Sequence, residues 1–179
     1  MSDLRLIRDQ KIIKFNYDQN FKKDDFYISS SNQHIFKIIN DWPKWEKNFL
    51  NINGDNYSGK THLINIFLKR FKGIKFEANL FNNDNLKEIK VHQNIILENL
   101  TKDVDEKLIY TLLNIIDQDN KYLIVTSNIP IVEINFVLKD LKSRTNNFLL
   151  QSIKKPDDDL LFALILKNLS DRQISLEKK

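Results

Sequence analysis

Residues 54–61 decide the fold, and they read Gly54-Asp55-Asn56-Tyr57-Ser58-Gly59-Lys60-Thr61. The stretch matches G-x-x-x-x-G-K-[ST] in full, between a short apolar segment at 49–53 and a helical pattern that begins at Lys60. The glycines let the backbone wrap a phosphate with its N–H groups, and a helix start adds positive partial charge. Lys60 would reach the β and γ phosphates of a nucleotide, and the Thr61 hydroxyl would bind Mg²⁺. The alternative is a chance match, which is rare in a chain with only 3 glycines.

Strands and helices alternate on both sides of this loop. Apolar segments predict strands at 49–53, 74–78, 94–98, 122–126 and 148–150. Helical spacing and helix-start residues predict helices at 31–42, 60–73, 103–116, 131–141 and 156–170, with a weakly helical stretch at 82–90. This order predicts an α/β fold of the P-loop NTPase type, with a mostly parallel sheet flanked by helices. Gly54, Glu98 and residues 126–128 fall at strand ends, so they could share one site.

Charge and cysteine content narrow the class of protein. The chain has 179 residues, a formal net charge of +4 and no cysteine, which excludes a disulfide scaffold, a zinc ribbon and a thiol nucleophile. Charged residues interrupt 1–14, so we expect no signal peptide, and the longest apolar run, 160–166, is far short of the ~18 residues of a membrane span. We therefore expect a cytoplasmic protein without membrane contact. Its mild charge allows a nucleic-acid neighbour but does not require one.

A P-loop protein needs an acidic residue at the end of a second buried strand to hold the Mg²⁺ shell. The segment 95–99, Ile-Ile-Leu-Glu-Asn, is the best candidate, and it makes Glu98 the acidic residue. Asn99 stands where a second carboxylate would activate water, and an asparagine cannot act as a general base. We therefore expect nucleotide binding with poor hydrolysis. The alternative is that Glu98 merely ends a strand.

Several motifs carry a resemblance to a known family. The run Gly59-Lys60-Thr61-His62-Leu63 looks like the G-K-T-H-L of the bacterial initiator DnaA and its relatives in the AAA+ superfamily. Residues 123–128, Leu-Ile-Val-Thr-Ser-Asn, are similar to the sensor 1 strand of that family, and 140–144, Asp-Leu-Lys-Ser-Arg, are similar to its arginine-finger segment. The runs Asp-Trp-Pro-Lys-Trp at 41–45 and Pro-Asp-Asp at 156–158 look like the DnaA-related Hda proteins, especially the HdaA type.

The resemblance implies roles for particular residues. Arg144 would be an arginine finger that reaches the γ-phosphate bound by a neighbouring subunit, although a surface arginine at a helix end is the alternative. Asn128 would be the sensor, with Thr126 as a second choice and a plain polar strand end as the alternative. Thr61 and Glu98 would hold Mg²⁺, the latter through water. The nucleotide would contact Gly54, Asp55, Asn56, Tyr57, Ser58, Gly59, Lys60, Thr61 and His62.

The N-terminal segment resembles a peptide by which Hda proteins bind the DNA sliding clamp. It reads Gln-Lys-Ile-Ile-Lys-Phe at 10–15, and Gln10, Ile13 and Phe15 match the motif, whereas Lys11 replaces a frequent leucine. The alternative is an edge strand of the domain. We expect an arm at 1–28, a AAA+ nucleotide-binding core at 29–153, and the start of an incomplete helical lid at 154–179.

The resemblance therefore predicts a regulator of replication initiation. It would bind ADP or ATP with Mg²⁺, dock on the sliding clamp (beta subunit), and stimulate ATP hydrolysis by DnaA while hydrolysing little itself. DNA would be contacted only indirectly, and a homo-oligomer is compatible with the motifs. Two alternatives stay open: a stand-alone P-loop kinase or ATPase, and an initiator or helicase-loader relative.

Overall fold

The computed structural model describes residues 27–171. Five strands form one sheet in the order β2-β3-β4-β1-β5, and each neighbouring pair is parallel. The strands are β1 (Phe49–Asn53), β2 (Ile74–Glu77), β3 (Asn94–Leu100), β4 (Tyr122–Ser127) and β5 (Leu149–Ser152). The predicted α/β fold with a parallel sheet is confirmed.

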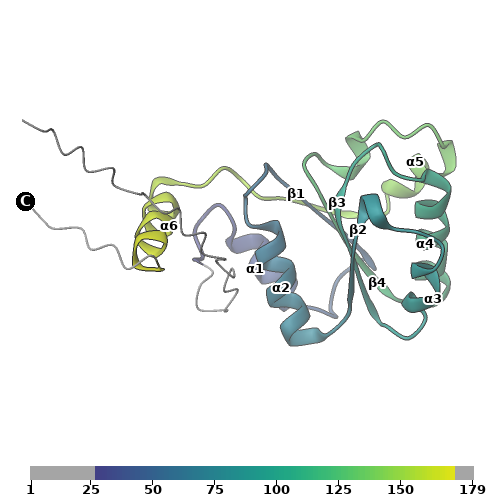
Figure 1. The fold of residues 1–179 in the computed structure, drawn as a ribbon, viewed down its shortest axis with the longest axis horizontal. Helices are drawn as coiled ribbons and strands as arrows, with labels where there is room; N and C mark the ends of the chain where they lie inside the picture. Colours follow the sequence, from purple (N-terminus) through teal and green to yellow (C-terminus); the bar gives the residue numbers. More distant parts are fainter. Residues whose placement is uncertain (1–26, 172–179) are drawn as a thin grey trace, which may run out of the picture.

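Helices cover both faces of this sheet (Figure 1). The described α-helices are α1 (Gln33–Asn40), α2 (Lys60–Phe71), α3 (Asn85–Ile89), α4 (Glu106–Gln118), α5 (Lys139–Thr145) and α6 (Asp158–Asp171). α1 and α2 pack on one face, in a core that includes Leu50, Ile52 and Ile96 of the sheet. α3, α4 and α5 pack on the other face, where Ile95 and Leu97 belong to a second core. Adjacent strand residues thus face opposite layers, as the period of a strand requires.

Because the strands are parallel, their carboxyl ends lie together at one edge of the sheet and their amino ends lie at the opposite edge. β1, β3 and β4 all end at the same edge, which therefore carries the phosphate loop 54–61, Glu98 and residues 127–128. A helix that links two parallel strands runs back across the sheet, so α4 begins at this edge and ends at the opposite one. The candidate site residues from three strands are thus brought together by topology, as expected for open parallel sheets.

The predicted helix over 131–141 is wrong. The chain instead forms a short 3₁₀ turn, η3 (Ile131–Glu133), an extended segment, and then α5. The backbone N–H of Ile131 donates to Asn51 Oδ1 at 2.9 Å, and the N–H groups of Val137 and Leu138 donate to the Glu106 carboxylate at 2.9 and 2.6 Å. Side chains distant in sequence thus satisfy these donors, and those of Val137 and Leu138 are ones that a continuous helix would have paired internally.

Several predicted element ends shift in the structure, most clearly those of β3, α4 and α2. β3 continues past Glu98 to Leu100, and α4 begins at Glu106 because the Asp105 carboxylate caps it, accepting from the N–H groups of Lys107 and Leu108. α2 ends at Phe71, before the predicted stop at Gly73, and the residue with positive φ is Lys72, at 52°. Gly73 is needed for space instead, since an added Cβ would lie 2.6 Å from the carbonyl oxygen of Asn94.

The C-terminal helix α6 follows a short connection after β5 (Figure 1). The backbone N–H of Leu160 donates to Asp157 Oδ1 at 2.9 Å, and Ser30 Oγ donates to Asp157 Oδ2 at 2.9 Å. Apolar side chains of α6 are exposed, at Leu161, Phe162, Leu164, Ile165 and Leu166. No helix within residues 27–171 is long and apolar enough to cross a membrane.

Candidate nucleotide-binding site

The phosphate loop turns sharply between β1 and α2. The backbone N–H of Gly54 donates to the Ser127 carbonyl at 3.2 Å, which ties the start of the loop to the end of β4. A Cβ at Gly54 would lie 3.0 Å from Ser58 Oγ and 3.2 Å from Ile153 Cβ, so a larger residue would fill the space inside the turn. Gly59 adopts φ 96° as the N-cap of α2, a conformation that favours glycine. Glycine is thus favoured at both positions, by close neighbours at Gly54 and by the positive φ at Gly59.

Lys60 lies inside the loop as the first residue of α2. It is 7% exposed, and its Nζ donates to the carbonyl oxygens of Gly54 at 2.7 Å and Asp55 at 2.9 Å. Burial lowers the pKa of the Lys60 ammonium below its ordinary value, while the carboxylates of Asp55 and Glu98 act in the opposite direction. An anionic phosphate placed at this ammonium would be a stronger partner than the neutral carbonyl oxygens that now accept from it.

The loop offers further polar groups that suit a phosphate. Within the described part of the chain, Ser58 Oγ is buried and has no hydrogen-bond partner. The N-cap Gly59 supplies no side-chain acceptor to the first turn of α2, so the dipole of that turn faces the loop. Thr61 is exposed on the same turn and His62 is half-buried, while Asp55, Asn56 and Tyr57 form the exposed tip. This arrangement fits a bound phosphate group.

The end of β4 distinguishes the two sensor candidates. Asn128 is exposed, and its Oδ1 accepts from Lys60 Nζ at 3.5 Å, so it lies beside the phosphate loop. Thr126 is fully buried, and its Oγ1 accepts from the backbone N–H of Asn99 at 3.0 Å. Thr126 thus holds β3 and β4 together, and the geometry favours Asn128 as the residue that could contact a nucleotide.

A buried amide supports the loop that carries Asn128. Asn51 Nδ2 donates to the Val125 carbonyl at 3.1 Å and to Ser127 Oγ at 2.9 Å, and Ser127 Oγ donates to the Ile129 carbonyl at 2.6 Å. Sequence reasoning missed Asn51, and it included Ser127 only as one of the strand-end residues 126–128. The available signal was a polar residue inside an otherwise apolar strand, because buried polar groups are almost always paired.

Glu98 lies near the end of β3, on the face of the sheet that α2 covers. Ile96, two residues earlier in the strand, points to the same face and packs in the core with α2. It is 1% exposed, and its Oε2 is 2.8 Å from Lys75 Nζ on β2. No group of three or more His, Cys, Asp or Glu side chains within residues 27–171 could hold a metal ion. Thr61 remains available to Mg²⁺, but the Glu98 carboxylate is already engaged by a lysine, so the donor set fits Mg²⁺ only in part.

Asn99 points away from the phosphate loop. It has φ 60°, at an irregularity in the pairing of β3 with β4, and its Nδ2 donates to Glu77 Oε2 at 2.9 Å. The side chain that stands where a catalytic carboxylate was expected is therefore both unable to accept a proton and turned towards the edge strand β2.

Arg144 lies in the last turn of α5, and its Nη1 is 3.4 Å from Asp117 Oδ2 in the last turn of α4. The guanidinium also lies 5.6 Å from the ring centre of Tyr110. Because α4 ends at the edge where the strands begin, Arg144 and the phosphate loop lie at opposite edges of the sheet. Gln10, Ile13 and Phe15 lie outside the described residues, so the clamp peptide stays a prediction.

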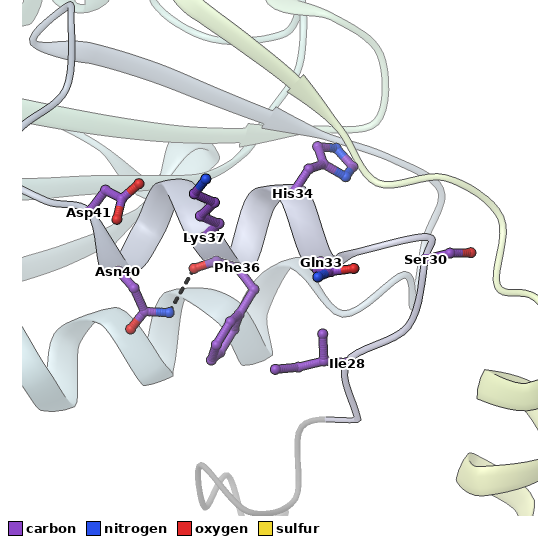
Figure 2. Close-up of a pocket in the computed structure, with 8 residues that line it drawn as sticks. All are labelled: Ile28, Ser30, Gln33, His34, Phe36, Lys37, Asn40 and Asp41. Atoms are coloured by element: carbon purple, nitrogen blue, oxygen red, sulfur yellow. Dashed lines mark hydrogen bonds between the residues drawn. The ribbon is translucent and has the colours of Figure 1, made fainter.

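A hollow of about 600 Å³ lies elsewhere, along α1 (Figure 2). It is bordered by Ile28, His34 and Phe36, and Asn40 Nδ2 donates to the Phe36 carbonyl at 2.7 Å on its wall. The sequence-predicted site residues do not line it, so the phosphate loop remains the candidate site.

Comparison with known proteins identifies the fold. No protein-family model matches the chain, and no curated protein is similar to it in sequence. AMPPCP-bound DnaA from Aquifex aeolicus superposes with a TM-score of 0.69 at 18% identity, covering 87% of this chain and 56% of that one. Domain III of DnaA from Thermotoga maritima gives a TM-score of 0.69 at 16% identity, covering 90% and 78%. DnaI gives 0.54 at 16% identity, covering 72% and 84%.

These similarities show that the chain has the fold of the corresponding part of DnaA. The chain spans little more than half the length of the Aquifex aeolicus protein to which it is similar. The expected α/β fold of the P-loop NTPase type is therefore confirmed.

Proposed function

We propose that this chain is an Hda-like regulator that binds ADP or ATP at its phosphate loop and stimulates hydrolysis of the ATP bound to DnaA. The fold shared with the AAA+ domain of DnaA supports this proposal, as does the resemblance of 59–63, 123–128 and 140–144 to the motifs of that family. The buried Lys60 ammonium and the free hydroxyl of Ser58 support nucleotide binding at the loop.

The position of Arg144 is the observation that carries the proposed action on a partner. Its guanidinium lies beside Asp117, at the sheet edge opposite the phosphate loop. A nucleotide in the chain's own loop would be out of reach of Arg144. An arginine so placed suits a finger that stabilises the charge developing on a nucleotide held by another subunit.

The geometry of Asn99 supports weak intrinsic hydrolysis. Its amide cannot take a proton from water, and it donates to Glu77 rather than facing the loop. A turnover assay on the purified chain separates this proposal from a stand-alone ATPase or kinase. Robust hydrolysis without a partner would favour the stand-alone enzyme.

Nucleotide binding is tested with two buried lysines. Lys60→Met removes the ammonium inside the loop, and we expect it to abolish ADP binding in isothermal titration calorimetry. Lys121→Met is the matched control, because Lys121 is also 7% exposed and also donates to two carbonyl oxygens, those of Lys90 and His92, but lies at the start of β4. Equal ADP affinity in the two variants would contradict binding at the loop.

Stimulation of DnaA is tested with two stacked arginines. We expect Arg144→Ala to abolish stimulation of ATP hydrolysis by DnaA and to leave binding to the sliding clamp intact. Arg70→Ala is the control, since Arg70 stacks on Phe71 at 4.8 Å but belongs to α2. Unchanged stimulation by Arg144→Ala would overturn the assignment of the finger.

Clamp binding is a separate part of the proposal and rests on the sequence of 10–15 alone. A pull-down with the sliding clamp compares the full chain with a Gln10→Ala, Phe15→Ala double variant. Loss of capture only in the variant supports the regulator, whereas equal capture of both proteins removes this segment from the proposal.

A further inference from the structure

The carboxylate expected to hold a metal shell already has a cationic partner. Glu98 is 1% exposed, its Oε2 lies 2.8 Å from Lys75 Nζ, and within residues 27–171 its Oε1 has no hydrogen-bond partner. A buried carboxylate without a counter-charge is strongly unfavourable, so the ion pair with Lys75 is what makes this burial possible.

The pairing of β2 with β3 brings Lys75 to this carboxylate. Lys75 is in register with Ile96, two residues before Glu98, a separation of about 6.6 Å along the strand that a lysine side chain can span. Lys75 keeps 35% of its side chain exposed, whereas Glu98 keeps 1%. The Lys75 side chain therefore extends from the half-exposed edge strand β2 across the surface of the sheet to the buried Glu98 carboxylate.

The Glu98 carboxylate also acts on Lys60, although the two groups form no ion pair within the described residues. Glu98 lies close enough to Lys60 to raise the pKa of its ammonium, against the larger effect of burial. The direct ammonium partner of Glu98 is therefore Lys75. Asn99 adds no negative charge and donates to Glu77. A divalent cation placed here would meet the Lys75 ammonium and a single carboxylate, of which Oε2 is already paired and only Oε1 is left without a partner.

We propose that the Lys75 ammonium supplies at Glu98 the positive charge that Mg²⁺ would otherwise supply, so that the site binds ADP with little dependence on Mg²⁺. This inference rests on the proposed nucleotide binding at the phosphate loop. Lys75 acts as a positioning residue: it neutralises Glu98 and leaves Lys60 and the turn of α2 to neutralise the phosphates. The sequence had assigned Glu98 to the Mg²⁺ shell without indicating any partner for it.

The experiment measures ADP affinity by calorimetry in excess Mg²⁺ and in EDTA. For the full chain we expect the two affinities to agree within about threefold, well under the 10- to 100-fold range of effects seen when partners of metal ligands are changed. Lys75→Met frees Glu98, and we expect chelation then to weaken ADP binding by about tenfold. Lys75→Arg keeps the charge and should behave like the unchanged chain.

Lys87→Met is the matched control, because Lys87 pairs with Asp84 at the same 2.8 Å but both side chains are largely exposed. It should leave the Mg²⁺ dependence as it is. A tenfold loss of affinity on chelation in the unchanged chain would overturn the inference while leaving nucleotide binding in place. An absence of ADP binding in both buffers would instead overturn the proposed function and this inference together.

Circular dichroism shows whether Lys75→Met is folded, and this must be known before its ADP affinity is compared with that of the unchanged chain. Lys75→Met leaves a buried acid unpaired, so its melting temperature must be recorded beside its affinity. Should Lys75→Met not fold, the unchanged chain and Lys75→Arg still decide, since both must bind ADP equally well with and without Mg²⁺. A strong Mg²⁺ requirement in either one contradicts the inference.

Discussion

The Nη1 atom of Arg144 lies 3.4 Å from Asp117 Oδ2, so the guanidinium proposed to act on a partner is held by its own chain. The pair is exposed, with 30% of the Arg144 side chain and 60% of the Asp117 side chain accessible. An exposed pair of this kind contributes about 1 kcal/mol or less to stability. It can therefore hold Arg144 in place in the free protein and yield to a stronger anionic partner.

Asp117→Asn should raise the stimulation of DnaA. The substitution removes the charge that competes for Arg144, and the expected gain is about two- to fivefold at limiting protein concentration, in line with an exposed pair. The measurement is ATP hydrolysis by DnaA. Asp84→Asn is the control, because it breaks the exposed pair with Lys87 far from α5. Reduced stimulation by Asp117→Asn would show instead that Asp117 orients Arg144 productively.

Tyr57→Gly should stabilise the protein. Tyr57 has φ 63° at the tip of the phosphate loop, which is unfavourable for a residue with a Cβ, and its side chain is fully exposed, so no packing is lost on removal. We expect a gain of about 1 kcal/mol in the free energy of unfolding, measured by chemical denaturation. Tyr57→Ala keeps the Cβ and should show no such gain. Equal stability of the glycine and alanine variants would contradict this explanation.

The strands were predictable from sequence because burial on both faces leaves segments that are mostly apolar. The segments 49–53 and 122–126 are nearly the observed β1 and β4, since the parallel sheet is covered by helices on each side. The phosphate loop was equally visible, because Gly59 has a positive φ and Lys60 donates to carbonyl oxygens only five and six residues before it. The sequence therefore predicted structure correctly where the residues that contact one another are also close in the sequence.

The failures arose where the partner is distant in the chain. Nothing local in 131–141 reveals that Asn51 and Glu106 accept its backbone N–H groups, so helical spacing was misread there. In the same way, Lys75 appears in the sequence as one polar position of an alternating strand. Its contact with Glu98 depends on β2 pairing with β3, which the sequence alone did not specify.

Gly73→Ala should destabilise the protein by about 1–3 kcal/mol, the usual cost of overpacking. The added Cβ would lie 2.6 Å from the carbonyl oxygen and 2.9 Å from Cβ of Asn94, at the buried start of β3. Asn94 cannot retreat easily, because its Nδ2 donates to the carbonyls of Phe71 and Lys72. Thermal and chemical denaturation measure the loss. Lys72→Ala, one residue earlier and exposed, should change stability little, and a similar loss there would point to a general effect on this turn.

The lowered pKa of Lys60 gives the free protein and its complex different pH dependence. The pKa lies below the ordinary value of 10.5 because of burial, so between the lowered value and 10.5 the unfolded chain binds more protons than the folded one. Stability of the free protein therefore rises with pH across that window. The cost of burying a protonated Lys60 is fully present below the window and is gone above it.

The affinity for ADP should change with pH in the opposite direction to the stability of the free protein. Phosphate favours the ammonium form of Lys60 and raises its pKa, so ADP affinity should be level below the lowered pKa of the free protein and fall as pH rises through it towards 10.5. Calorimetry in two buffers of different ionisation enthalpy should detect proton uptake on binding within this window. Lys121→Met, which keeps Lys60, should retain the same profile. An ADP affinity that stays constant across the window, or binding without proton uptake, would show that Lys60 does not meet the phosphates.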